Sequence, residues 1–259
     1  ASSNYVLALP QQYAYFIKRL GVFSHVNAYE ENGSVMITVT PNINLFKDSG
    51  ADYFTIDLEA FILDDYEKDK IDQYLKAQGT IKLTGKYKII SPILSYYAMN
   101  ISYISYSDAT DDSVTAQVLS VLSDYFLNLS STNRIPRSEI VSLITSGVKD
   151  IHSVDIQFIS KKNEDYHSAQ KTLVENKLKN LESSLTTNAG IKDDPNYDRN
   201  KVLGIDPIMG DIVFESTEIP LIRGGWKDRN SNYYSDAIDT LGLKSVNMIK
   251  KGTIDRKNK

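Results

Sequence analysis

The chain of 259 residues contains no cysteine, which excludes disulfide bonds and thiolate metal sites. It also lacks an excess of positive charge: the formal net charge is −4, and lysine and arginine are scattered along the chain. Nucleic-acid binding therefore has no electrostatic support. The most apolar stretch, residues 89–104, contains Pro92 and several polar residues, so it cannot supply the ~20 apolar residues that span a bilayer. We expect neither nucleic acid nor a membrane as a partner.

Motifs that carry chemistry are scarce as well. The glycines form no phosphate-binding loop, and no serine sits in a nucleophile elbow. The histidines His25, His152 and His167 belong to no catalytic motif. Residues 194–198 space oxygen ligands as a calcium loop does, but Arg199 stands where that loop needs glycine. We therefore expect no enzymatic activity, no cofactor and no metal ion.

What the chain does contain is apolar and tyrosine-rich sequence. Hydrophobic residues make up 41% and charged residues 24%, which is typical of a globular protein with one large core or two modest cores. There are 17 tyrosines. A tyrosine ring with one hydroxyl suits half-exposed positions, so these residues fit either subunit contacts or an ordinary β-core.

The N-terminal part has a helical and then a β pattern. Residues 11–20 predict a short helix that follows Pro10 and ends at Gly21. Residues 22–29 and 34–40 predict a hairpin, because the Asn32-Gly33 pair between them tolerates positive φ. A charged segment with apolar residues at helical spacing predicts a second helix over residues 63–77, with its acidic residues facing solvent.

Residues 95–160 predict one continuous α+β unit. Residues 86–106 alternate like a strand with one buried face, and a long amphipathic helix follows with apolar residues from Val114 to Leu129 on one face. A second helix runs from Ser138 to Gly147, and residues 154–158 form a return strand. The two strands can pair antiparallel with both helices on one face, which leaves the other face able to meet a partner.

We divide the chain into four parts. Residues 1–50 form a helix and hairpin subdomain, residues 51–160 the α+β core, residues 161–190 a helical segment, and residues 191–259 a C-terminal subdomain rich in β-structure and loops. The fold class is α+β, with small antiparallel sheets and helices packed on one face. The C-terminal subdomain has β-like runs at 211–215 and 218–222 and ends in a lysine-rich tail.

One short element of the C-terminal subdomain suggests an interface. Gly224-Gly225 allows a tight bend that presents the lone tryptophan beside two arginines, and tryptophan and arginine are the residue types that most often anchor interfaces. The residues proposed for this protein interface are Ile222, Arg223, Trp226 and Arg229. An alternative with equal weight is that Trp226 folds back over its own hairpin.

The residues resemble a known family. The order of elements, with PRSEIVSLI at 136–144 and SVDIQF at 153–158, resembles the baseplate J-like proteins of contractile phage tails. More closely, four segments look like the C-terminal part of the large baseplate wedge protein of T-even-type phages: TIDLE at 55–59, FILDDY at 61–66, KIDQYL at 70–75 and PLIRGGW at 220–226. The resemblance covers nearly the whole chain.

The resemblance implies a structural protein of the virion, present in the tail baseplate after assembly in the host cytoplasm. It implies homodimer contacts that join neighbouring wedges into a ring around the tail hub, and contacts with other baseplate wedge proteins. No catalytic residues transfer from this family. It also implies that an N-terminal region precedes the present chain.

A second hypothesis comes from another class of function. A tail-associated carbohydrate-binding or glycan-hydrolysing module could use tyrosines and Trp226 as a platform for sugar rings. Hydrolysis would also require two carboxylates that face each other across a cleft, about 5 to 9.5 Å apart.

Overall fold

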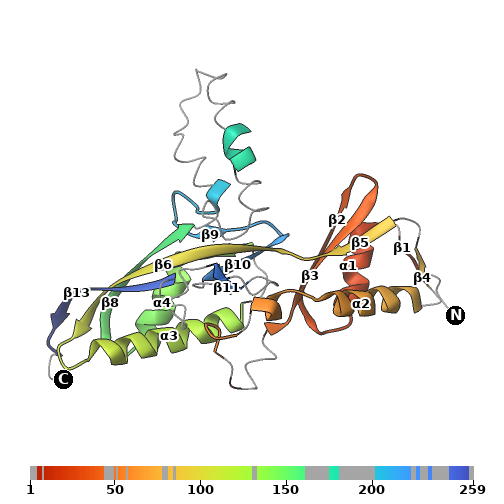
Figure 1. Cartoon of the computed structure of the whole chain (residues 1–259). Helices are drawn as coiled ribbons and strands as arrows, with labels where there is room; N and C mark the ends of the chain where they lie inside the picture. The colour runs from red at the N-terminus through yellow and green to blue at the C-terminus, as the bar shows by residue number, and fades with distance from the viewer. Residues whose placement is uncertain are drawn as a thin grey trace.

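The computed structural model describes residues 5–7, 9–43, 50, 52–56, 58–77, 81–83, 86–129, 133–160, 175–180, 202–222, 226–227, 233–234 and 245–256. These residues form two units, each built around its own buried hydrophobic cluster (Figure 1). The α+β class is confirmed. The division into four parts stays a prediction.

The smaller unit packs two helices with a three-stranded sheet. Helix α1 (Pro10–Lys18) and helix α2 (Asp65–Ala77) share a cluster with strands β2 (Phe23–Glu31), β3 (Ser34–Pro41) and β5 (Lys86–Ile90). The sheet order is β2-β3-β5, and β5 runs parallel to β3. Short strands β1 (Tyr5–Leu7) and β4 (Ile81–Leu83) pair in parallel beside it. The buried hydrophobic side chains are Tyr13, Phe16, Ile17, Val35, Ile37, Val39, Leu63, Ile71 and Leu75.

The hairpin and both helices of this unit follow the sequence patterns. Asn32 and Gly33 have φ of 49° and 71°, so the turn between β2 and β3 uses the left-handed conformation at both central residues, as predicted. Helix α2 begins with a reciprocal cap: Glu67 N–H donates to the Asp64 carboxylate, and Asp64 N–H donates to the Glu67 carboxylate. Asp65, Glu67 and Asp69 are exposed, as predicted, whereas Asp72 is half-buried and accepts hydrogen bonds from Tyr87 and Lys76.

The larger unit is built on one long strand, β6 (Ile93–Tyr106). Strand β8 (Ile151–Ser160) pairs with β6 antiparallel, as predicted. Strands β10 (Glu218–Ile222) and β13 (Val246–Ile254) pair with β6 in parallel. The sheets are therefore mixed, and β13, which overlaps the end of the chain expected to be a lysine-rich tail, is a strand of the central sheet. A 3-10 turn, η2 (Leu58–Phe61), follows a segment that also packs on this unit.

Helices α3 (Asp111–Leu127) and α4 (Arg137–Gly147) cover one face of this sheet (Figure 1). Thr110 caps α3 by accepting a hydrogen bond from the Ser113 N–H. Residues at intervals of four along α3 are fully buried, so the helix presents one apolar stripe to the sheet. They are Val114, Val118, Leu122 and Phe126. Ile140 and Ile144 of α4 are also fully buried and form the apolar face of that helix.

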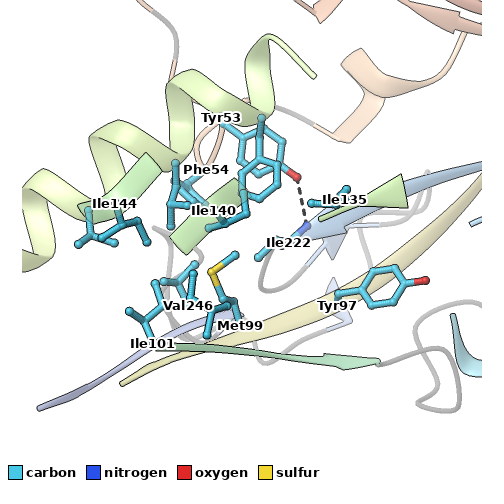
Figure 2. Packing of buried hydrophobic residues seen from close by; sticks show 14 of the residues in the cluster. Tyr53, Phe54, Tyr97, Met99, Ile101, Ile135, Ile140, Ile144, Ile222 and Val246 are labelled. Carbon is cyan, nitrogen blue, oxygen red and sulfur yellow. Dashed lines mark hydrogen bonds between the residues drawn. The ribbon is translucent and has the colours of Figure 1, made fainter. Parts of the chain in front are cut away.

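The core of the larger unit lies between these helices and the sheet (Figure 2). Met99 and Ile101 of β6 meet Ile140 and Ile144 of α4 in one cluster, which confirms that both helices bury their apolar faces on the same side. Tyr53 reaches into this cluster from the segment before η2. Burial alternates along β6 from Met99 to Tyr106, so alternate side chains enter the core there, whereas Ser95 to Met99 are all buried.

Both the backbone and a surface hydrogen bond join the units. Only Ser91 and Pro92 separate β5 from β6, so nearly continuous extended chain runs from the small sheet into the large one (Figure 1). On the surface, Asn27 of β2 donates a side-chain hydrogen bond to the Ser216 hydroxyl at 3.0 Å. The hairpin of the smaller unit therefore rests on the segment that precedes β10.

Candidate interaction surfaces

The proposed interface residues fall in different environments. Ile222 is fully buried in the core of the larger unit, so its side chain is not at the surface of this chain. Trp226 lies in strand β11 (Trp226–Lys227), opposite Tyr234 of strand β12 (Tyr233–Tyr234). The side chain of Trp226 lies outside the described residues, as do Arg223 and Arg229. Both interpretations of Trp226 stay predictions.

The face of the central sheet opposite α3 and α4 is a first candidate surface. Neither α3 nor α4 lies on this face (Figure 1). Register places Gln157, Asn100 and Asn247 in one row across β8, β6 and β13, and Asn247 donates a hydrogen bond to Asn100 at 3.0 Å. Half-buried or exposed isoleucines flank this row: Ile104, Ile159, Ile249 and Ile254. This mixture of apolar and polar groups is typical of non-obligate interfaces.

The edges of this sheet are protected against indiscriminate pairing. Arg137 reaches from the start of α4 to β8, where it donates hydrogen bonds to the Asp155 carboxylate at 3.2 Å and to the Ile156 carbonyl at 3.3 Å. Strand β13 carries Lys250 and Lys251 at an irregularity in its pairing with β6. These charged side chains discourage a further strand from pairing with either edge. The open face, which is the face of the sheet opposite α3 and α4, is therefore a better contact surface than the edges.

A turn at residues 206–211 is a second candidate, and the sequence analysis did not find it. It projects from strand β9 (Ile212–Val213), which pairs antiparallel with β7 (Arg134–Ile135). Ile208 is 77% exposed and Met209 is 52% exposed at its tip. The run Asp-Pro-Ile-Met-Gly-Asp contains a turn signal around two apolar residues, which could have marked it.

Charged groups hold this turn in place. Arg134 forms ion pairs with Asp206 at 2.8 Å and with Asp211 at 2.9 Å. The Asp206 carboxylate also accepts hydrogen bonds from the backbone N–H groups of Ile208 and Met209. These two N–H groups, with a smaller contribution from Arg134, lower the pKa of Asp206. The buried Asp211 carboxylate accepts in addition from the Arg137 N–H.

A cavity of about 70 Å³ lies where the two units meet. Aromatic and aliphatic residues line it together with small neutral polar residues, His25 and Glu218. The pKa of His25 is lowered, mainly by burial and then by the nearby Lys18. Glu218 is the one carboxylate among the described lining residues. The apolar lining residues are Ile43, Tyr53, Phe61, Phe126, Leu129, Phe214, Ile219 and Pro220.

A wider groove of about 530 Å³ lies between α3 and α4. Two carboxylates, Asp124 and Glu139, line it together with Tyr125 and Leu143. The Tyr125 hydroxyl donates to Glu139 at 3.1 Å, and burial followed by this carboxylate raises the pKa of Tyr125. The groove thus places an aromatic ring beside acidic groups.

The described residues give little support for a metal site or a catalytic histidine. No group of three or more histidine and carboxylate side chains there could hold a metal ion. His152 is exposed and its ring meets the edge of Tyr106, whereas His167 and the segment 194–198 lie outside the described part of the chain. No helix within the described ranges is long and apolar enough to cross a bilayer.

Comparison with known proteins gives likenesses to solved structures only. No family model matches the sequence, and no curated protein matches it. The chain is similar to a protein in the cryo-EM structure of the anti-feeding prophage baseplate, with 9% identity and a TM-score of 0.39. The match covers 62% of this chain and 34% of that one, so this chain spans about a third of its length. A likeness of this degree carries no argument about function.

Proposed function

We propose that the chain is a structural component of a contractile-tail baseplate, in which it joins neighbouring wedges into a ring around the tail hub through contacts with other copies of itself. Other wedge proteins would bind to the same ring. The sequence segments at 55–75, 136–158 and 220–226 support the family assignment. The anti-feeding prophage structure is of a baseplate too, but the proposal does not rest on it.

The observation that carries the proposal is the one-sided sheet. Helices α3 and α4 cover one face of the central sheet. The opposite face carries Asn100, Ile104 and Ile249 and presents a mixture of polar and apolar side chains. An assembly protein needs such a surface, because recognition between folded subunits depends on complementary area of this composition. Arg137 and the lysines of β13 direct association towards that face and away from the strand edges.

Analytical ultracentrifugation of the purified chain tests the proposal. We expect the sedimentation coefficient to rise with concentration into the high micromolar range, as it does for weak contacts between folded subunits. A strict monomer at the highest attainable concentration would contradict self-association. The variant Ile249→Lys, which places a charge on the open face, should weaken association without a change in melting temperature.

A carbohydrate-binding module is the second candidate, and the groove between α3 and α4 favours it. Tyr125, Asp124 and Glu139 line this groove, which is the combination of ring and acid that sugar recognition uses. A glycan-binding screen with the wild-type chain and the Glu139→Gln variant tests it. Binding that is lost in the variant would support this function, and no binding at all would remove it.

A further inference from the structure

The backbone crosses between the two units at closely placed points. Strands β3 and β5 run parallel, with Thr38 paired to Ile90, so both strands leave the smaller sheet at the same end. Strand β3 continues into Asn42 and Ile43, and Ile43 packs against the core of the larger unit. Strand β5 continues through Ser91-Pro92 into β6. These two crossings therefore lie side by side.

Another crossing beside them is equally short. Phe61 is buried in the core of the larger unit and Leu63 in the core of the smaller unit, so Ile62 alone spans the boundary. The 3-10 turn η2, which ends at Phe61, lies close to β3. Hinges between domains consist of a few residues of this kind, because a small number of backbone torsions can absorb the whole rotation.

The opposite side of the junction is closed by side chains. The smaller sheet has the order β2-β3-β5, so β2 is the strand farthest from the β5 crossing. Asn27 of β2 donates to the Ser216 hydroxyl at 3.0 Å, and the ring of His25 is hydrogen-bonded to the Ser216 backbone. The turn that carries Ser216 belongs to the larger sheet, because the Ile93 N–H of β6 donates to the Thr217 carbonyl at 2.8 Å. We call the two contacts of β2 with Ser216 the latch.

The cavity of about 70 Å³ lies beside the latch. Ser24 and His25 of β2 and Thr40 of β3 line it from the smaller unit, and Ser216 lines it from the larger unit. The two units therefore do not fill the space between them, and the smaller unit contributes polar side chains to it. Domains move relative to one another unless a large hydrophobic interface joins them.

We propose that the smaller unit swings about a hinge at Asn42, Ile62 and Ser91-Pro92, and that the latch between β2 and Ser216 holds the junction closed. When the latch opens, β2 moves away from Ser216 and the cavity widens. Rotation about the hinge keeps both hydrophobic cores intact, because each core lies within one unit. The inference concerns a single copy of the chain and goes beyond the proposed self-association.

Distances between two spin labels, measured by double electron–electron resonance, test the inference. The chain has no cysteine, so Glu31→Cys at the end of β2 and Ser120→Cys on α3 supply the attachment sites, and both residues are exposed. Labelled chain is diluted into an excess of unlabelled chain, so that only distances within one copy are recorded. With the latch intact, we expect one main distance.

Two latch variants should lengthen this distance. Asn27→Ala with Ser216→Ala removes the side-chain hydrogen bond, which should raise the ratio of open to closed chains about two- to tenfold. Asn27→Asp with Ser216→Asp places two carboxylates side by side, and their repulsion at pH 8 should make the longer distance the main one. The same distribution of distances in the intact chain and in both variants would overturn the hinge.

Asn100→Asp with Asn247→Asp is the matched control. These two asparagines are also hydrogen-bonded at 3.0 Å, but they join two strands of the larger sheet, so the label distance should stay as in the intact chain. A longer distance in this control as well would overturn the inference, because the shift would not come from the latch. Circular dichroism checks that each variant is folded, and if the charged latch pair unfolds the smaller unit, the alanine pair decides. A strict monomer in sedimentation contradicts the proposed function and leaves these distances unaffected.

Discussion

The phenol oxygen of Tyr53 lies 3.1 Å from the backbone nitrogen of Ile222 and accepts its hydrogen bond (Figure 2). The two residues are 169 positions apart, and both are buried. Tyr53 also stacks at 5.0 Å on the ring of Phe126, and its own N–H donates to the Ser123 hydroxyl at 2.9 Å. The segment before η2 is thereby fixed between helix α3 and strand β10.

Replacement of Tyr53 by phenylalanine should destabilise the chain by about 1 to 3 kcal/mol, because it leaves the buried Ile222 N–H without its acceptor. Urea unfolding followed by circular dichroism measures the change. Tyr15→Phe is the matched control, since Tyr15 is 63% exposed and should give almost no effect. Equal midpoints for both variants would show that the Tyr53 hydroxyl contributes nothing.

Phe126→Ala should cost about 3 to 5 kcal/mol, since the ring is 2% exposed in the core of the larger unit and its removal leaves a cavity. Chemical denaturation gives the free energy of unfolding. Tyr66→Ala removes an aromatic ring from helix α2 where it is 67% exposed, so it serves as the control. A near-neutral Phe126 variant would refute the packing of α3 on the sheet.

Gly33→Ala should destabilise the chain by about 1 to 2 kcal/mol, because alanine is strained at a φ of 71°. A Cβ at this position meets no other atom within 4 Å, so the strain is purely one of backbone conformation. Gly252→Ala also meets open space but does not require positive φ, and its stability should match wild type. Thermal melts of the two variants and of wild type compare their melting temperatures.

Acidification should destabilise the chain through His25. Burial lowers the pKa of His25 in the folded chain, so the unfolded chain binds a proton at a higher pH than the folded chain does. Stability is therefore full above the ordinary pKa of about 6.5 and falls as the pH drops through that value towards the lowered one. In His25→Gln, the urea midpoint should change less between pH 8 and pH 5.5 than in wild type. Parallel pH profiles would refute this assignment.

Substitution of Trp226 by alanine should weaken self-association and leave the melting temperature unchanged, if the residue serves an interface as the sequence predicts. Arg223→Ala should act in the same direction. Sedimentation velocity and a thermal melt on the same samples give both readouts. Unchanged association with an unchanged melt would place the contact elsewhere on the chain.

Local patterns in the sequence predicted several of the helices and strands in the two units. The four-residue spacing from Val114 to Phe126 predicted α3, and the Asn32-Gly33 pair predicted the hairpin turn. These features depend only on neighbouring residues, so a single sequence suffices for them. The antiparallel pairing of β6 with β8 followed because two intervening helices return the chain to the same sheet.

The features that the sequence did not predict depend on distant partners. Val246 and Met248 point into the core, but Lys250 and Lys251 break the alternation of β13, so the segment looks like a polar tail until β6 is beside it. Ile222 looked like part of an exposed element, yet its pairing with Tyr97 of β6 buries it. The apolar tip of the 206–211 turn is held by Arg134, more than 70 positions earlier, which no local pattern reveals.

Strands β5 and β6 form almost one backbone that takes part in both sheets. A pulling force applied to β5 would therefore pass along covalent bonds into the middle of the larger sheet. There β6 has neighbours on both sides, and load along the strand would strain many hydrogen bonds at once instead of opening them one at a time. The β5–β6 backbone is thus suited to carry tension between the two sheets with little extension.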